Sequence, residues 1–413
     1  MRILILGAGP AGLTVAERLR ELAVAGDVDL DMVCEEPFPP YSPPAMAEYF
    51  LTGREEPLYW KGKDVLERLG VNLHRAAARA VDPGAKRVEL TTGETLSYDR
   101  LVITTGSRLH TELPGVDLPG VYNFKSLRAA TTLVERARRG EATSALIVGA
   151  GFIGVEVALL LSDLGLEVTM ISRRWVMPRG LDPETGDFVL AALQGRGVAV
   201  RMYQPAEAFE GETEVEAVRL AGGERLSADV YVAATGVKPN IECLAGSGLA
   251  SDWGVTVDDE LRASDLDIYA AGDVAETRDR LTGERYVHAI FPNAVHQGQV
   301  VAERLLGFDT VYEGAESMNS LRHLGVPVVA AGVPRLEDSR GEELRMRHEG
   351  VLRKLFIDDG RITGFQLAGD IRGAGVYRRM MLGHADVGGY GPHLLEPTFG
   401  AGSIAMRAVA GVG

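Results

Sequence analysis

A short apolar strand followed at once by a glycine-rich turn opens the chain, and it constrains the fold more than any other feature. The apolar run is Ile3-Leu4-Ile5-Leu6, and Gly7-Ala8-Gly9-Pro10-Ala11-Gly12 follows it. Residues 13–20 then show a helical pattern. A fully apolar run of this length is typical of a buried parallel strand. The segment therefore predicts a strand-turn-helix unit of a parallel sheet.

Each glycine of this turn has its own task. Gly7 permits the tight turn, Gly9 lets the backbone approach a pyrophosphate, and Gly12 lets helix and strand touch. The helix N-terminus offers free N–H groups and a partial positive charge to the same pyrophosphate. The next strand is expected over 28–34, and Glu35 follows it, 23 residues beyond Gly12, where a carboxylate can accept the ribose hydroxyls of an adenosine. These features predict a dinucleotide site, and a glycine-rich turn without ligand is the alternative.

The same plan occurs a second time. Residues 145–148 are apolar and precede Gly149-Ala150-Gly151-Phe152-Ile153-Gly154, whose glycines lie 142 residues after their counterparts. A strand over 167–171 follows. Each copy also has a later apolar strand that ends in Thr-Gly, at Thr105-Gly106 and at Thr235-Gly236. Internal duplication is a strong organisational signal, and two copies predict two bound dinucleotides.

Length and composition place the chain among multidomain globular proteins. Its 413 residues are too many for one core, and 46% hydrophobic and 24% charged residues are ordinary values. No apolar run approaches the roughly 20 residues that cross a bilayer, and no leader precedes the first strand, so we expect a cytoplasmic protein. The net charge of −15 argues against nucleic acid and anionic membranes as partners.

The two cysteines, Cys34 and Cys243, lie far apart in the sequence. Neither belongs to a C-x-x-C or a metal-ligand spacing, so we expect neither a metal site nor a disulfide between neighbouring cysteines. Residues 313–413 hold equal numbers of basic and acidic residues, and the rest of the chain carries the whole acidic excess. This last segment is therefore expected to be a separate unit.

Between the motifs, local patterns predict further elements. We expect a helix over 58–70 that ends at Gly70, and short strands with turns between residues 71 and 95. In the last hundred residues the patterns predict strands over 352–357 and 362–368 and a helix over 374–382.

Five motifs occur along the chain in the order typical of one family. They make the chain resemble the pyridine nucleotide-disulfide oxidoreductase family, which consists of flavoproteins with two dinucleotide domains. Residues 7–12 with Glu35 resemble the family's FAD-adenosine site, and residues 149–154 its nicotinamide-nucleotide site. The two Thr-Gly closures and the run Tyr269-Ala270-Ala271-Gly272-Asp273, whose Asp holds the ribityl chain in the family, complete the set. The match covers about residues 1–310 and implies an FAD-dependent NAD(P)H oxidoreductase.

The resemblance assigns individual residues to each cofactor. Those assigned to FAD are Gly7, Gly9, Pro10, Ala11, Gly12, Glu35, Thr105, Gly106, Gly272, Asp273, Asn293, Ala294 and Gln297. Those assigned to NAD(P)H are Gly149, Gly151, Phe152, Ile153, Gly154, Ser172, Arg173, Arg174, Thr235 and Gly236. Glu156 is predicted as the catalytic residue near the nicotinamide ring, and a partly buried structural acid is the alternative.

The resemblance also implies the architecture: an α/β fold with two Rossmann-like three-layer nucleotide-binding domains and a small α+β C-terminal domain. We expect a discontinuous FAD domain over 1–112 and 240–312, an NAD(P)H domain over 113–239, and an interface domain over 313–413. In that last part, residues 318–322 and 364–370 resemble the rubredoxin reductase and nitrite reductase branch. That branch implies an electron-acceptor protein, either rubredoxin, ferredoxin or an iron-sulfur subunit, and a homodimer or a larger complex.

One departure from the family narrows the chemistry. The disulfide branch carries two cysteines on the helix after the ribose acid, and the oxidase and peroxidase branch carries one, whereas residues 41–53 contain none. Three functions stay open: an electron-transfer reductase, an oxidase that reduces dioxygen at the flavin, and a nucleotide-sensing flavoprotein that regulates partner binding and resembles apoptosis-inducing factors. Arg372, Arg378 and Arg379 could dock an acidic carrier or form a solvated helix face.

The nucleotide preference is predicted from the second copy. Ser172 stands where the first copy has Glu35, and Arg173 and Arg174 follow it. An acid at this position accepts the ribose 2′-OH and repels a 2′-phosphate, whereas guanidiniums pair with a phosphate. The pattern favours NADPH over NADH, and the alternative is that both arginines point to solvent.

Overall fold

The computed structural model describes residues 1–24, 26–321, 325, 327–333 and 341–400. The chain divides into two compact units. The first comprises residues 1–111, 125–132 and 236–315, and the second residues 112–124, 133–235 and 316 onwards. Each unit contains a five-stranded parallel sheet, and the second adds an antiparallel sheet, so the predicted fold class is confirmed.

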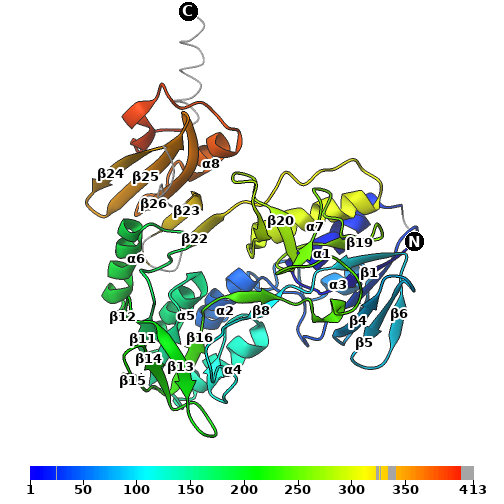
Figure 1. The fold of residues 1–413 in the computed structure, drawn as a ribbon, viewed down its shortest axis with the longest axis horizontal. Coiled ribbons are helices and arrows are strands. Elements are labelled where there is room, and N and C mark those ends of the chain that lie inside the picture. Colours follow the sequence, from blue (N-terminus) through cyan, green and yellow to red (C-terminus); the bar gives the residue numbers. More distant parts are fainter. Residues whose placement is uncertain (25, 322–324, 326, 334–340, 401–413) are drawn as a thin grey trace, which may run out of the picture. The chain divides into compact units, whose positions relative to one another are not determined.

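The parallel sheet of the first unit has the order β19-β7-β1-β2-β3. Its strands are β1 (Arg2–Leu6), β2 (Asp29–Val33), β3 (Asn72–His74), β7 (Arg100–Ile103) and β19 (Ile268–Ala270). β1 is central, and Ile3, Leu4 and Ile5 are fully buried, as an apolar strand covered on both sides requires. Helices α1 (Pro10–Leu22) and α7 (Phe291–Leu305) pack against each other beside it (Figure 1).

The parallel sheet of the second unit has the order β12-β11-β10-β16-β9. Its strands are β9 (Val121–Tyr122), β10 (Ser144–Val148), β11 (Glu167–Ile171), β12 (Ala199–Arg201) and β16 (Val230–Ala233). Helix α5 (Phe152–Asp163) packs on β10 and β11, and α6 (Pro183–Gly195) follows β11. The edge strand β9 precedes the glycine motif, whereas its counterpart β19 comes late in the chain. This is why residues 112–124 belong to the second unit.

The duplication extends beyond the parallel sheets. Each unit carries a three-stranded antiparallel sheet in the chain segment directly before one of its parallel strands, β7 in the first unit and β16 in the second. These are β4 (Ala78–Asp82), β5 (Arg87–Leu90) and β6 (Thr95–Ser97), and β13 (Ala206–Glu210), β14 (Ala217–Leu220) and β15 (Arg225–Leu226). The expected short strands between residues 71 and 95 are therefore confirmed.

Smaller elements complete the first unit. Two small sheets pair β8 (Ser107–Leu109) with β17 (Val237–Pro239), and β18 (Val255–Thr256) and β21 (Arg285–Val287) with β20 (Ala275–Arg278). The short helices are η1 (Pro43–Ala45), α2 (Met46–Thr52), α3 (Val65–Arg68) and η2 (Glu242–Leu244). Helix α4 (Leu127–Arg138) crosses the boundary between the two units.

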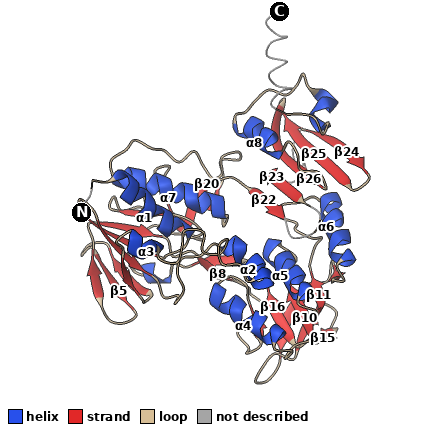
Figure 2. Ribbon diagram, turned by 180° about the vertical axis from the view of Figure 1, so that it is seen from behind, coloured by secondary structure: helices blue, strands red, loops and turns tan. Residues whose placement is uncertain are grey.

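The C-terminal part is an antiparallel sheet in the order β22-β23-β26-β25-β24. Its strands are β22 (Met318–Leu321), β23 (Val328–Gly332), β24 (Glu342–His348), β25 (Val351–Asp358) and β26 (Arg361–Ala368), followed by α8 (Ala374–Leu382) and η3 (Gly391–Leu395). The predicted strands and helix are confirmed here. Helix α8 packs on β26, and α6 reaches the same strand (Figure 2). Because the sheet falls in the second unit, the division into three domains stays a prediction. Arg322 and residues 401–413 lie outside the described residues.

One local prediction is wrong. The helix expected over 58–70 is only the single turn α3, Val65–Arg68, and turns precede it. Gly62 has a φ of +86° and lies in the left-handed region, which interrupts a helical run. The spacing of the apolar residues does not indicate this backbone conformation of Gly62. Within the described ranges, no helix is both long enough and apolar enough to cross a membrane.

The glycine turn offers a test that separates folding from ligand binding. A Cβ at Gly12 would lie 2.1 Å from the carbonyl oxygen of Gly7 and 2.7 Å from Oγ1 of Thr104, whereas one at Gly9 meets nothing within 4 Å. We expect Gly12→Ala to lower the calorimetric unfolding midpoint of the apoprotein, because backbone must move, and Gly9→Ala to leave it unchanged. Equal midpoints for the two variants would contradict this account of the packing.

Candidate dinucleotide-binding sites

The glycine turn of the first unit is shaped by hydrogen bonds to its neighbours. Gly7 has a φ of +115°, and its N–H donates to the carbonyl oxygen of Val33 at 2.8 Å. The Thr104 hydroxyl donates to the carbonyl oxygen of Gly7 at 3.0 Å. Gly9 caps α1 without any side-chain hydrogen bond, and the space beside its Cα is open. The helix N-terminus is thus a cradle that fits an anionic pyrophosphate.

Gly272 brings three elements of the first unit together. A Cβ there would lie 3.1 Å from that of Ala11 on α1 and 3.6 Å from that of Ala294 on α7. Ala294 and Asn293 are buried in the first turn of α7, whose N-cap Ile290 makes no side-chain capping bond. The structure therefore brings the first glycine motif, the end of β19 and the α7 N-terminus together, as the motif order predicts.

Asp273, next to Gly272, has its carboxylate fixed by two side chains. Its Oδ2 accepts hydrogen bonds from the Ser107 hydroxyl and from the Lys125 ammonium, both at 2.8 Å. Sequence reasoning named neither partner. Ser107 had a signal, since it directly follows Gly106, but Lys125 lies 148 residues from Asp273 and no local pattern connects them. The pair orients an acid that the family resemblance assigns to the ribityl chain.

The Thr-Gly closure of the first unit is tied to the segment after β17. The Thr105 hydroxyl donates to the carbonyl oxygen of Asn240 at 2.7 Å, and the Asn240 amide donates back to that of Thr105 at 2.9 Å. The Asn240 N–H donates to the carbonyl oxygen of Gly106 at 2.9 Å. These bonds hold Thr105 and Gly106 at the carboxyl edge of β7, where the FAD assignment needs them.

Gln297 and Glu35, two of the residues assigned to FAD, differ in the exposure of their side chains. Gln297 is 1% exposed; its Oε1 accepts from the Gly272 N–H at 2.7 Å and its Nε2 donates to the Tyr312 hydroxyl at 3.1 Å. Its amide therefore supports the Gly272 turn, and direct contact with FAD stays a prediction. Glu35, which follows β2, is exposed. Its neighbour Glu36 accepts a hydrogen bond from the Tyr41 hydroxyl at 3.2 Å, and burial raises the pKa of Glu36.

The second unit repeats the cradle. Gly149 has a φ of +114°, and its N–H donates to the carbonyl oxygen of Ile171 at 2.9 Å. A Cβ at Gly154 would lie 2.0 Å from the carbonyl oxygen of Gly149, while one at Gly151 meets nothing within 4 Å. Gly151 caps α5 without a side-chain bond, and Phe152 and Ile153 begin that helix. This N-terminus therefore also fits a pyrophosphate.

The loop after β11 presents two arginines. Arg173 and Arg174 are exposed, and their guanidiniums make no ion pair within the described part of the chain. Ser172 is buried, and its hydroxyl accepts the Arg174 N–H at 3.3 Å. Its predicted bond to a phosphate thus competes with a bond inside the loop. The exposed Tyr203, with a φ of +59°, precedes Gln204, whose N–H donates to the carbonyl oxygen of Ser172. The sequence analysis did not name Tyr203.

The remaining second-copy residues lie around the end of β16. Ala234 and then Thr235 follow that strand, and the carbonyl oxygen of Ala234 lies 2.3 Å from the Cβ position of Gly149. Gly236 belongs to the first unit, where its carbonyl oxygen accepts the His110 N–H at 3.0 Å. The closure thus touches the glycine turn in this copy too.

Glu156, on α5, is a carboxyl group without a hydrogen-bond or ion-pair partner among the described residues. Burial raises its pKa to about 7. A group that titrates near neutrality through desolvation is typical of functional sites. The catalytic role of Glu156 stays a prediction.

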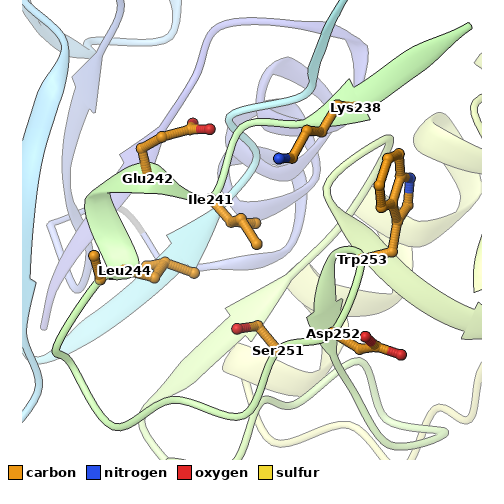
Figure 3. A pocket seen from close by; sticks show the side chains of 8 residues that line it. Lys238, Ile241, Glu242, Leu244, Ser251, Asp252 and Trp253 are labelled. Carbon is orange, nitrogen blue, oxygen red and sulfur yellow. The ribbon is translucent and has the colours of Figure 1, made fainter. Parts of the chain in front are cut away.

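A separate pocket of about 350 Å³ lies in the first unit (Figure 3). It is lined by Lys238, Ile241, Glu242, Leu244, Ala245, Ser251, Asp252 and Trp253. The Lys238 ammonium lies 5.8 Å from the centre of the Trp253 ring. None of the predicted cofactor residues lines this pocket, so the cofactor assignments depend on the two helix-terminal cradles instead.

Two backbone cradles, each on a parallel sheet, define a protein with two dinucleotide sites. The model of the family described as "Pyridine nucleotide-disulphide oxidoreductase" matches residues 1–298. The chain belongs to this family, which binds FAD and NAD(P)H, and it is an FAD-dependent NAD(P)H oxidoreductase.

Relatives show the range of this family. The chain is 28% identical over 405 residues to the assimilatory nitrate reductase electron transfer subunit of Bacillus subtilis, covering 96% of this chain but only 51%, about half, of that protein. It is 32% identical over 319 residues to rubredoxin-NAD(+) reductase of Pseudomonas putida, covering 75% and 81%. Among solved structures, a ferredoxin reductase of the CYP199A2 system from Rhodopseudomonas palustris is 26% identical with a TM-score of 0.81, covering 89% and 91%.

Asp273 allows a test of the FAD site. Asp273→Asn removes the negative charge that holds Lys125 and Ser107, so we expect the purified variant to retain well under half of the wild-type FAD content. The measurement is the ratio of flavin to protein absorbance before and after incubation with FAD. Asp267→Asn is the matched control, since Asp267 also bonds cationic side chains in this unit. Full FAD content in Asp273→Asn would contradict the assignment.

Glu156 predicts a pH-dependent stability effect. Burial raises its folded pKa to about 7 from an ordinary value of 4.5, so the charged form opposes folding. The penalty is absent below pH 4.5 and complete above pH 7, where it reaches at most about 3 kcal/mol. We expect Glu156→Gln to raise the unfolding midpoint at pH 8.5 and to have little effect at pH 5. A shift of equal size at both pH values would contradict the account of a partly buried, unpartnered carboxyl.

Proposed function

We propose that this chain passes electrons from NAD(P)H through bound FAD to an iron-sulfur or rubredoxin-type acceptor protein or partner subunit, without a redox disulfide. FAD supplies the redox chemistry when bound. The chain's own part is to hold Asp273 between Ser107 and Lys125 and to present the helix N-termini of α1 and α5 to the pyrophosphates. The names of the relatives support an electron-transfer reductase.

The observation that carries the proposal is the state of the two thiols. Cys34 and Cys243 are free, and burial raises the pKa of both, that of Cys243 to about 11. Since the thiolate is the reactive form, neither group offers redox chemistry near neutral pH. Electrons that enter the protein therefore need an acceptor outside this chain.

Two of the three arginines that could dock an acidic acceptor are already paired with carboxylates of this chain. Arg372 pairs with Asp370 at 2.8 Å, and Arg378 pairs with Glu316 at 2.7 Å. Most of the charge of the cluster is thus matched inside the chain. A homodimer or a complex built through residues 313–413, and a cytoplasmic location, stay predictions.

Acceptor specificity tests the proposal. We expect NAD(P)H-dependent reduction of a rubredoxin or a [2Fe–2S] ferredoxin, followed optically, to exceed the rate of dioxygen consumption by at least tenfold. Cys34→Ser and Cys243→Ser, alone and together, should keep this rate within about threefold, because neither thiol ionises. Faster reaction with dioxygen would favour the oxidase alternative. Loss of turnover with FAD retained in a cysteine variant would disprove the thiol-free route.

We further propose that NADPH is preferred over NADH. Arg173 and Arg174 extend from the end of β11 with no carboxylate paired to them in the described chain, and Ser172 replaces the acid that would repel a 2′-phosphate. Charge-assisted hydrogen bonds contribute about 1.5–3 kcal/mol, which corresponds to at least about a tenfold preference.

The matching experiment measures kcat/KM for both nucleotides. We expect Arg173→Ala/Arg174→Ala to lower the value for NADPH about tenfold and to leave that for NADH within twofold. Arg138→Ala/Arg139→Ala, another adjacent arginine pair of the same unit, is the control and should change neither. Equal use of both nucleotides by the wild type, unaffected by losing Arg173 and Arg174, would overturn the preference.

A further inference from the structure

Residues 172–182, here called the nucleotide-recognition loop, connect β11 to α6 and form a compact structure. The Met177 N–H donates to the carbonyl oxygen of Ala150 in the glycine turn at 2.7 Å, and Met177 itself has a φ of +57°. Its carbonyl oxygen accepts the N–H groups of Gly180 and Leu181, each at 3.0 Å. The Trp175 indole N–H donates to the carbonyl oxygen of Leu181 at 3.0 Å. The hydrogen bond from Met177, near the middle of the loop, therefore fixes the loop to the glycine turn.

The loop ends at Asp182, which is buried and bonded in three directions. Its Oδ1 accepts the Thr185 N–H at 2.8 Å and caps α6. Its own N–H donates to Oε1 of Gln366 on β26 at 3.3 Å. Its Oδ2 accepts a hydrogen bond from the Lys354 ammonium on β25. The end of the loop is thus bound to the C-terminal sheet.

Lys354 is a buried cation with three carboxylates around it. Its side chain is 4% exposed, and its ammonium lies 2.8 Å from Glu184 and 3.4 Å from Glu343, in addition to Asp182. Burial alone would lower the pKa of Lys354, but the hydrogen bonds to Asp182 and Glu184 outweigh it and raise the pKa. The Arg345 guanidinium, 2.8 Å from Glu184, is the main reason that the pKa of Glu184 falls to about 2.

Such a cluster has little value as a source of stability. Desolvation of a buried ion pair offsets most of its attraction, and a buried pair is a better device for fixing one arrangement than for stabilising a fold. The arrangement fixed here is the position of Asp182, where the nucleotide-recognition loop ends and α6 begins. Arg173 and Arg174 lie at the other end of the same loop.

We propose that the C-terminal sheet, through Lys354 and Gln366, holds the nucleotide-recognition loop in the conformation in which Arg173 and Arg174 bind the 2′-phosphate of NADPH. Asp182 and Lys354 are positioning residues and do not contact the nucleotide. A loop held in its binding conformation loses less conformational freedom when the phosphate binds, so its affinity is higher. The proposal rests on the proposed nucleotide preference and goes beyond it by giving the C-terminal sheet a part in nucleotide recognition.

The test uses Asp182→Asn in the full-length protein with FAD bound. Asparagine keeps the α6 cap but removes the charge that Lys354 holds, and Lys354 keeps Glu184 and Glu343 as partners. We expect KM for NADPH and the calorimetric Kd for NADP⁺ to rise about tenfold, with kcat and FAD content within twofold of wild type. Asp229→Asn is the matched control, because Asp229 accepts hydrogen bonds from Thr143 and Ser144 in the same unit, and it should change neither constant.

A double-mutant cycle separates positioning from a general structural effect. In the Arg173→Ala/Arg174→Ala background, Asp182→Asn should cause no further change in Kd for NADP⁺, since it acts only through the arginines. An equal loss in both backgrounds would overturn the proposal. Gln366→Met is a second variant that should raise Kd in the same direction, and it keeps the test available if Asp182→Asn folds poorly.

The two proposals fail in different ways. If the wild type does not bind NADP⁺ more tightly than NAD⁺, or if the arginine variant binds NADP⁺ as the wild type does, the proposed nucleotide preference is wrong. If both of those measurements hold and Asp182→Asn and Gln366→Met still bind NADP⁺ with wild-type Kd, the preference stands and the role of the C-terminal sheet is overturned.

Discussion

The close backbone contact inside each glycine turn is the constraint on which both units depend. At Gly12 and at Gly154 a single added carbon would lie about 2 Å from the carbonyl oxygen of the first glycine of the turn. Helix and strand can pack at this distance only without a side chain, and the helix N-terminus then projects beyond the sheet edge with its N–H groups uncapped. The anion-binding cradle is therefore a consequence of how the parallel sheet is assembled.

The two copies differ in how the neighbouring strand completes this contact. In the first, the Thr104 hydroxyl bonds to the carbonyl oxygen of Gly7. In the second, Ala234 takes the same place and its methyl group lies 3.5 Å from the Cβ position of Gly154. A hydroxyl and a methyl group satisfy the same geometry by a hydrogen bond and by apolar packing. In both copies, the strand that makes this contact is followed by a Thr-Gly pair at the edge of the sheet.

Much of the fold could be predicted because its signals are local. An apolar run between glycines identifies a buried strand from a few residues, and β11 and α8 begin and end where the patterns place them. The exception is instructive: the residues before Val65 have helical spacing, but Gly62 takes a left-handed conformation that spacing does not reveal. Residues around the cofactors were predictable where a motif specifies backbone shape, as at Gly7 and Gly149.

The side chains that orient those motifs could not be predicted, because they come from distant parts of the chain. Lys125 lies 148 residues from Asp273 in the sequence, and Lys354 reaches Asp182 from the C-terminal sheet, which the glycine motifs do not describe. Neither lysine differs in the sequence from an ordinary surface lysine. What distinguishes them is a carboxylate partner from a distant part of the chain, joined in Lys354 by burial, and both of these are properties of the folded structure.

Glu156 and Lys354 show two opposite ways to place a charge out of water. Lys354 is surrounded by three carboxylates, so it stays charged and defines a geometry. Glu156 has no partner in the described residues, and its pKa rises to about 7, so it carries a proton for much of the time at neutral pH. A carboxyl group without a partner opposes folding whenever it ionises, and a purely structural role would be served better by a neutral or apolar side chain. The partly buried carboxyl without a partner therefore agrees with the predicted role of Glu156, on the same helix whose first N–H groups form the second cradle.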